Sequence, residues 1–356
     1  MTVQQKINPF QNRTPQQHSN SRYARVIAIS SGKGGVGKSS LSINLAVELS
    51  RLQRDVCVFD ADTNLANVNI MTGLNPSHTL DDVLHGDKIL SDIVLRGPAG
   101  IHIIPAASGI MSMVEHEASD QQQLVKMIRH LEQDYDYLLI DTGAGISETV
   151  LGFLMAAPEV IMTITPEPTS LTDAFSLLKV LRKRGFDQPV QVLVNRAPSF
   201  QLAKQALMRF AGALKKYLAL TVVAPGYILE DKNVPRSIMV QRPFALMYPN
   251  SPASRCIRNF AQRVDEKDRG LDFLLSDYLA SQTSPATAIT PDPRQQPWVD
   301  DLIQRIDSEP YDQIEPVMER VSRHWSLRRA RENRRTQTTP DEGFSKAIHF
   351  AGKIER

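Results

Sequence analysis

A glycine-rich stretch with two lysines, residues 32–39, constrains the fold of this chain more than any other feature. It reads GKGGVGKS and begins two serines after the apolar run Val26–Ile29. This order matches the pattern G-x-x-x-x-G-K-[ST], in which backbone N–H groups and a helix N-terminus surround a phosphate. Lys38 is then expected to reach the terminal phosphates, and Ser39 to ligate Mg²⁺. The motif therefore predicts a strand, a phosphate-binding loop and a helix.

Further along the chain, short apolar runs rich in β-branched residues alternate with longer stretches of helical spacing. Continuously apolar strands joined by helices predict a parallel sheet that is covered on both faces. The predicted strands are Val26–Ser30, Val56–Asp60, Ile101–Pro105, Tyr137–Asp141, Val160–Thr165, Val190–Asn195 and Leu220–Val223. After the helix that follows the loop, further helices are predicted at Gln122–Glu132, Ser147–Ala156, Leu171–Arg184, Phe200–Tyr217 and Ser254–Val264. We expect an α/β fold with a doubly wound, mostly parallel sheet of the P-loop NTPase type.

Acidic and amide side chains stand at or just past the ends of three predicted strands. They are Asp60, Asp62, Asp141 and Asn195. Ligands of such sheets bind at the carboxyl ends of the strands. An apolar run that ends in Asp141 has the Walker B pattern, and one aspartate with Ser39 and phosphates satisfies Mg²⁺. Asp60 and Asp62 fit either a capped acidic turn or a pair that acts on Mg²⁺-bound and attacking water, and the phosphate loop favours the second.

Charge and composition exclude some functions and divide the chain. The 356 residues carry a net charge of only +2, so no global attraction to nucleic acid or membrane is expected. Cys57 and Cys256 lack metal-type spacing and are expected to be reduced thiols. The polar start predicts no signal peptide. We expect a disordered segment 1–21, an ATPase domain 22–282, a linker 283–297 and a basic helical C-terminal extension 298–356.

A resemblance to a known family becomes specific at this point. The segments GKGGVGKSS, DADTNLANVNIMTGL, TLDDVLHG, IIPAASG, DTGAGI, EPTSLTDAFSLLKVL and VNRA follow one another along the chain. Their order resembles that of MinD/ParA-type ATPases, whose loop has a second lysine (the deviant Walker A motif). The PAASG and EPTSLTDA segments are most similar to the flagellar-number regulator branch, FlhG or FleN. The resemblance extends to about residue 282.

The resemblance implies a role for each matching residue. Lys33 would act in trans on the nucleotide of a partner subunit, and Asp62 would position the hydrolytic water. With Lys38 these are the expected catalytic residues. The residues expected to bind ATP are Gly32, Lys33, Gly34, Gly35, Val36, Gly37, Lys38, Ser39, Ser40, Asn195 and Arg196. Asn195 would read adenine, and Ser39, Asp60 and Asp141 would hold Mg²⁺.

The implied function is that of a slow, Mg²⁺-dependent ATP hydrolase that dimerises with ATP and regulates flagellar number, placement or gene expression. Its partner would be a flagellar GTPase or a flagellar transcription activator, and its place the cytoplasm, including the inner face of the membrane. A membrane-binding helix at 270–279 is less favoured than a helix packed on the domain, because Asp272 and Asp277 interrupt its apolar residues.

Other functional classes remain as alternatives. A ParA-type DNA-partitioning ATPase would use the basic stretch Arg320–Arg335 for phosphate contacts. A metal-cluster carrier on the same scaffold is disfavoured because the chain has no C-x-x-C motif.

Overall fold

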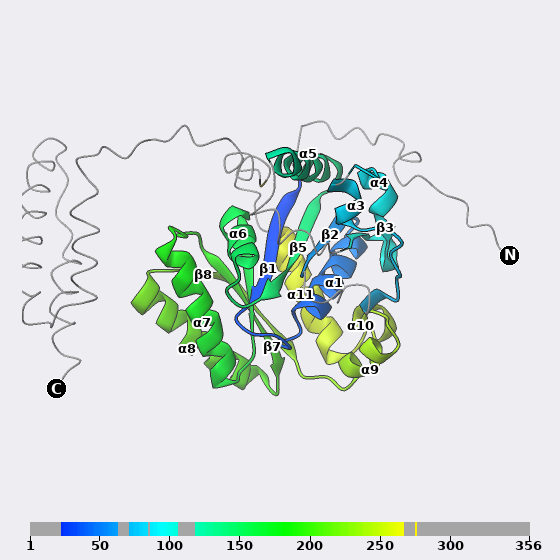
Figure 1. Ribbon diagram of the computed structural model, residues 1–356. Helices are drawn as coiled ribbons and strands as arrows, with labels where there is room; N and C mark the ends of the chain where they lie inside the picture. The colour runs from blue at the N-terminus through cyan, green and yellow to red at the C-terminus, as the bar shows by residue number, and fades with distance from the viewer. Residues whose placement is uncertain (1–22, 63–70, 85, 106–117, 267–274, 276–356) are drawn as a thin grey trace, which may run out of the picture. The chain divides into compact units, whose positions relative to one another are not determined.

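A central sheet organises the protein in the computed structural model, which describes residues 23–62, 71–84, 86–105, 118–266 and 275 (Figure 1). Within these residues eight strands form one sheet in the order β3-β4-β2-β5-β1-β6-β7-β8. The strands are β1 (Arg25–Ser31), β2 (Val56–Ala61), β3 (Leu95–Arg96), β4 (His102–Ile104), β5 (Tyr137–Ala144), β6 (Glu159–Ile164), β7 (Val190–Ala197) and β8 (Val222–Leu229). All pairs are parallel except β3 with β4. The prediction of a mostly parallel sheet is confirmed.

Helices cover both faces of the sheet, as a doubly wound fold requires (Figure 1). One face packs against α1 (Lys38–Arg51), α9 (Asn233–Met239), α10 (Phe244–Met247) and α11 (Pro252–Glu266). The other packs against α3 (Leu80–Leu84), α4 (Leu90–Ile93), α5 (Ala118–Asp134), α6 (Glu148–Ala156), α7 (Pro168–Lys183) and α8 (Phe200–Leu218). A short 3₁₀ turn, η1 (Pro98–Gly100), precedes β4. The connections β1–α1–β2 and β5–α6–β6 therefore lie on opposite faces.

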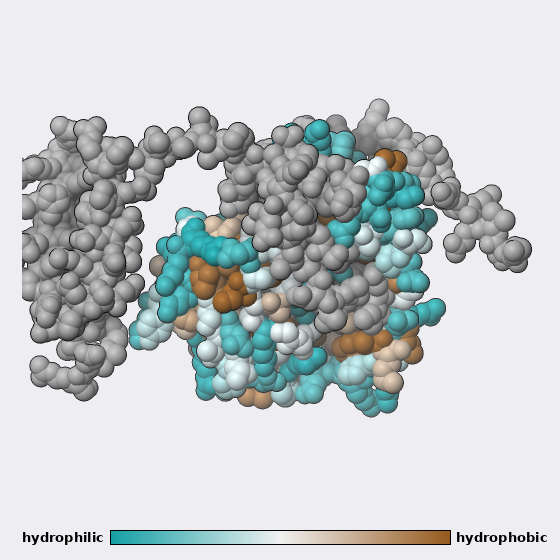
Figure 2. Space-filling view, in the orientation of Figure 1, coloured by the Kyte–Doolittle hydropathy of each residue, from teal (hydrophilic) through white to brown (hydrophobic). Residues whose placement is uncertain are grey.

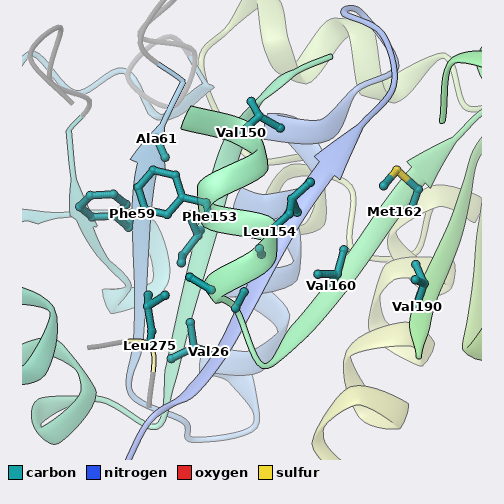
Figure 3. Packing of buried hydrophobic residues seen from close by; sticks show 14 of the residues in the cluster. Val26, Phe59, Ala61, Val150, Phe153, Leu154, Val160, Met162, Val190 and Leu275 are labelled. Carbon is teal, nitrogen blue, oxygen red and sulfur yellow. The ribbon is translucent and has the colours of Figure 1, made fainter. Parts of the chain in front are cut away.

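The inner strands of the sheet have long apolar runs because both of their faces are buried. In β1, Val26 and Ala28 belong to the core on one face of the sheet, whereas Ile27 and Ile29 belong to the core on the other. Figure 3 shows the first of these cores, where the rings of Phe59 and Phe153 have centroids 5.9 Å apart. Burial on alternate sides removes the polar alternation that a half-exposed strand shows.

One predicted strand is wrong in position. We expected a strand at Leu220–Val223, but β8 begins at Val222 and runs through Pro225 and Gly226 to Leu229. Within the described sheet β8 is an edge strand whose one neighbour is β7, so the missing N–H of the exposed Pro225 costs no ladder hydrogen bond. The short elements β3, α3, α4, α9 and α10 were also missed, because they are too short for a recognisable period.

Several predicted features lie outside the described residues. These are the segment 1–21, the linker 283–297, the extension 298–356 with its basic stretch, and most of 270–279. Within 270–279, Leu275 is described and is fully buried in the core that Figure 3 shows. Among the described residues no helix is long and apolar enough to cross a membrane.

Candidate functional site

The glycine loop joins β1 to α1 in a conformation that demands glycine at specific positions. Gly35 and Gly37 have φ angles of +77° and +92°. A Cβ atom on Gly32 would lie 2.1 Å from backbone atoms of Asp173 and Ala174 in α7. Gly37 is the N-cap of α1 and supplies no side-chain cap, and the first turn has no acidic residue. The first N–H groups of α1 are thus available to an anion.

Lys38, the first residue of α1, lies buried among carboxylates at the ends of β2 and β5. Its Nζ lies 3.2 Å from Asp141 Oδ1 and 3.9 Å from Asp62 Oδ2. Only 6% of its side chain is exposed. The parallel register places Asp60 directly beside Asp141. The structure therefore brings together the loop lysine and the three aspartates that the sequence singled out.

Burial strongly perturbs the carboxyl group of Asp60. The backbone N–H of Asp62, two residues further on, donates to Asp60 Oδ1 over 3.1 Å. Burial, with a smaller contribution from the charge of Asp141, raises the pKa of Asp60 to about 8. Among the described residues, Asp60, Asp62 and Asp141 gather around Lys38, so carboxyl groups are in excess over ammonium groups. A divalent cation would relieve that excess.

The donor set fits Mg²⁺ that is shared with phosphates. Asp60 Oδ2 and Asp141 Oδ2 are buried and have no hydrogen-bond partner among the described residues. Ser39 lies buried in the first turn of α1. The described residues hold no group of three ligands that would bind a metal by itself. Mg²⁺ takes one or two carboxylates and completes its shell with water and phosphate oxygens, so the unpartnered oxygens of Asp60 and Asp141 beside Ser39 suit it.

The side chain of Asn195 is hydrogen-bonded to the glycine loop. Its Nδ2 donates to the carbonyl of Val36 over 2.7 Å, and a Cβ on Gly37 would lie 2.5 Å from the same nitrogen. Asn195 is buried near the end of β7, whereas the next residue, Arg196, is exposed and has a φ of +52°. The carboxyl end of β7 thus lies against the loop, as the parallel fold predicts.

The second lysine points away from this buried cluster. Lys33 Nζ contacts Glu167 Oε2 at 2.9 Å and Thr169 Oγ1 at 3.0 Å, at the start of α7. The hydrogen bond from Lys33 and its charge lower the pKa of Glu167. Sequence reasoning did not find Glu167 or Thr169, although both lie in the EPTSLTDA segment. In this structure Lys33 is engaged within its own subunit.

Ser42 is another residue that sequence reasoning missed. It lies four residues after Lys38 and is fully buried in α1. Its Oγ donates to Asp141 Oδ1 over 3.0 Å. The helical spacing of four from Lys38 is the signal that could have found it, because residues so spaced share one face.

A separate groove lies between α7 and α8 and holds none of the predicted site residues. Its volume is about 610 Å³. The rings of Phe175 and Tyr217 line it edge to face, with centroids 6.3 Å apart. Figure 2 shows apolar surface among hydrophilic residues on the side of the domain where α6, α7 and α8 lie. The groove has a mainly apolar lining with Lys179 and Arg209, whereas the loop has the convergent charges that phosphate chemistry needs.

A glycine loop, a lysine among aspartates and a parallel sheet define a P-loop NTPase, and comparison with known proteins narrows the class. Residues 24–186 match a family model described as an AAA domain. The chain is 39% identical over 241 residues to the antiactivator FleN of Pseudomonas aeruginosa, which covers 68% of this chain and 86% of that protein. It is 38% identical over 167 residues to the flagellum site-determining protein YlxH of Helicobacter pylori, covering 46% and 56% respectively.

A solved structure agrees with this placement. The septum site-determining protein MinD of Pyrococcus horikoshii, complexed with Mg-ADP, superimposes with a TM-score of 0.56 at 27% identity. The alignment covers 68% of this chain and 96% of that one. The chain belongs to the MinD/ParA-type ATPases, in the branch of the flagellar-number regulators FleN and FlhG.

Proposed function

We propose that this protein binds ATP·Mg²⁺ at the glycine loop, hydrolyses it slowly and uses the nucleotide state as a dimerisation switch. One observation carries the proposal: Lys38, at the uncapped start of α1, is buried within 3.2 Å of Asp141 and 3.9 Å of Asp62. A buried ammonium at a helix N-terminus suits the β- and γ-phosphates of a nucleotide. The Mg-ADP in the related MinD supports this assignment.

Each residue of the site has a proposed role. The loop from Gly32 to Ser40 would surround the phosphates, and Asn195 and Arg196 would contact the base. Ser39, Asp60 and Asp141 would hold Mg²⁺, which when bound would neutralise charge on the phosphates. Asp62 orients the attacking water.

The switch is proposed to act on flagella. The relatives are named as an antiactivator and as a flagellum site-determining protein. By analogy, the ATP-bound dimer of this chain would present a surface to a flagellar transcription activator or a flagellar GTPase in the cytoplasm. Hydrolysis would dissolve the dimer and release the partner. Deletion of the gene should change flagellar number or position, and unchanged flagella would contradict this role.

Two substitutions test the chemistry separately. Lys38→Ala should abolish ATP binding in calorimetry, because the buried cation that meets the phosphates is lost. Asp62→Ala should bind ATP but turn over about a hundredfold or more slowly, the usual size of a lost positioning contact. Unchanged affinity in the first variant would refute the phosphate site. Wild-type turnover in the second would refute the role of Asp62.

A DNA-partitioning ATPase remains the second candidate because one helix has an unbalanced charge. α8 carries Lys204, Arg209, Lys215 and Lys216, all exposed, and no acidic residue. Such a surface suits the phosphates of nucleic acid. ATP-dependent retention on duplex DNA that weakens steeply with salt would favour this candidate. A changed flagellar number without DNA retention would favour the first.

A further inference from the structure

We infer that Ser42 is the residue that positions Asp141 for cation binding, an inference that rests on the proposed function. Ser42 lies on α1, and its hydroxyl donates to Asp141 Oδ1 over 3.0 Å. Asp141 Oδ1 also contacts Lys38 Nζ at 3.2 Å. The other oxygen, Oδ2, is buried without a partner among the described residues. The carboxylate is therefore held by one oxygen, which leaves the second for a cation or its bound water.

The hydroxyl of Ser42 has one proton and two acceptors within reach. Its Oγ also lies 3.1 Å from the carbonyl oxygen of Lys38 in its own helix. A carboxylate is a stronger acceptor than a neutral carbonyl. The Ser42 hydroxyl therefore donates its hydrogen bond to Asp141 and links α1 to the end of β5.

Nucleotide binding makes this link more important. In this structure, Lys38 and Ser42 both donate to Asp141 Oδ1. The long, flexible side chain of Lys38 is directed to the phosphates in the proposed function. Ser42 is different, because it is short, fully buried and fixed on the helix. It is the donor that keeps holding Asp141 when Lys38 turns to phosphate.

Asp60 explains why the orientation of Asp141 matters. Asp60 pairs with Asp141 in the strand register and also has a buried, unpartnered Oδ2. Free rotation of Asp141 would turn its charge toward Asp60 and away from the position that a shared cation would take, and this charge also opposes ionisation of Asp60. Fixing one oxygen of Asp141 allows the pair to face a shared cation.

The test compares three variants of the full chain. Ser42→Ala removes the hydroxyl, and Ser42→Thr restores it. Ser50→Ala makes the same change on the same helix, where the Ser50 hydroxyl donates to Ala99 and is remote from Asp141. Mg²⁺ is titrated calorimetrically into each protein that is saturated with a slowly hydrolysed ATP analogue. Affinity for the metal-free analogue and the melting temperature are measured in parallel.

Ser42→Ala should lower Mg²⁺ affinity about tenfold or more, as expected for one lost hydrogen bond to a charged group. Its affinity for the metal-free analogue should not change. Ser42→Thr should recover most of the Mg²⁺ affinity, and Ser50→Ala should match the wild type.

Equal Mg²⁺ affinity in wild type and Ser42→Ala would overturn the inference. So would parallel losses of Mg²⁺ affinity and melting temperature that Ser42→Thr does not recover, because they indicate a packing role. A wild-type protein that binds no analogue would instead refute the proposed function.

Discussion

At the scale of single residues, charge balance dominates the site. Lys38 contacts both Asp62 and Asp141, and Asp60 lies directly beside Asp141. Burial of three carboxylates around one cation is unfavourable unless protons or metal ions compensate. Asp60 keeps its proton at neutral pH, because its pKa is raised to about 8. Without Mg²⁺, the folded protein thus keeps a proton that the unfolded chain releases at a much lower pH.

This difference predicts a pH dependence of stability. Unfolded aspartate ionises near about pH 4, whereas folded Asp60 does so near pH 8. The folded state therefore binds the extra proton between these values, so its stability falls as pH rises through this window. Asp60→Asn cannot ionise and still accepts from Asp62 N–H. In Mg²⁺-free urea denaturation it should gain stability over wild type, by on the order of a few kcal/mol at about pH 8.

The exposed Asp87 offers a matched control for that measurement. Asp87→Asn removes the same carboxylate from the surface and should leave the pH slope as in wild type. If Asp60→Asn had the wild-type slope, Asp60 would be ionised in the folded protein and the assignment would be wrong.

At the scale of elements, the sequence predicted what local patterns encode. β1 and β5 were located because burial on both faces makes them continuously apolar. The helix starts at Phe200 and Glu148 were located to within a residue, and each follows a serine cap that accepts a backbone N–H. β8 was misplaced because its exposed edge tolerates Pro225.

In the candidate site, too, sequence patterns predicted one contact and missed another. Lys38 and Asp141 meet because a loop after β1 and the end of the adjacent β5 are forced together by the sheet order. Sequence patterns therefore predicted this pair. The contact of Lys33 with Glu167 depends on how the start of α7 turns beside the loop, 134 residues further along the chain. No local pattern encodes that turn, so this contact was missed.

The packing of β8 on α11 gives a prediction for two glycines. A Cβ on Gly226 would lie 2.4 Å from the ring of Phe260 in α11 and 2.8 Å from Leu193. Gly226→Ala should therefore destabilise the protein by about 1–3 kcal/mol, as overpacking does. Gly152, in the middle of α6, has open space around it. Gly152→Ala should stabilise by about 0.5–1 kcal/mol, because alanine favours a helix.

Urea denaturation midpoints of the two variants test this packing directly. Opposite signs are expected for the same added methyl group. Equal effects would show that β8 and α11 are not packed as closely as the Gly226–Phe260 contact requires.

At the scale of the whole molecule, the position of Lys33 connects one subunit to its proposed dimer. The structure holds Lys33 on Glu167 and Thr169 of its own chain. Both Lys33 and Glu167 are partly or largely exposed, with 35% and 64% of their side chains accessible. An exposed ion pair is weak because water competes for both charges. Lys33 can therefore leave Glu167 when a stronger anion arrives.

The nucleotide of a second subunit is the anion that we propose. Apposed phosphates in a dimer would need positive charge, and a charge-assisted contact contributes about 1.5–3 kcal/mol when well formed. A symmetric dimer makes the contact twice. Lys33→Ala should therefore shift dimerisation by orders of magnitude. ATP binding should persist, because Lys38 and Ser39 remain.

Light scattering with a slowly hydrolysed ATP analogue measures this shift. Wild type should be a dimer and Lys33→Ala a monomer at equal nucleotide occupancy. Glu167→Ala is a useful second variant, because it removes the ion-pair partner of Lys33 and leaves the nucleotide site unchanged. This variant should dimerise at a lower protein concentration than wild type. If wild type and Lys33→Ala both stay monomeric, or both dimerise equally, Lys33 does not act across subunits. Glu167→Ala would then be expected to match wild type, since releasing a lysine that has no second partner changes nothing in the association.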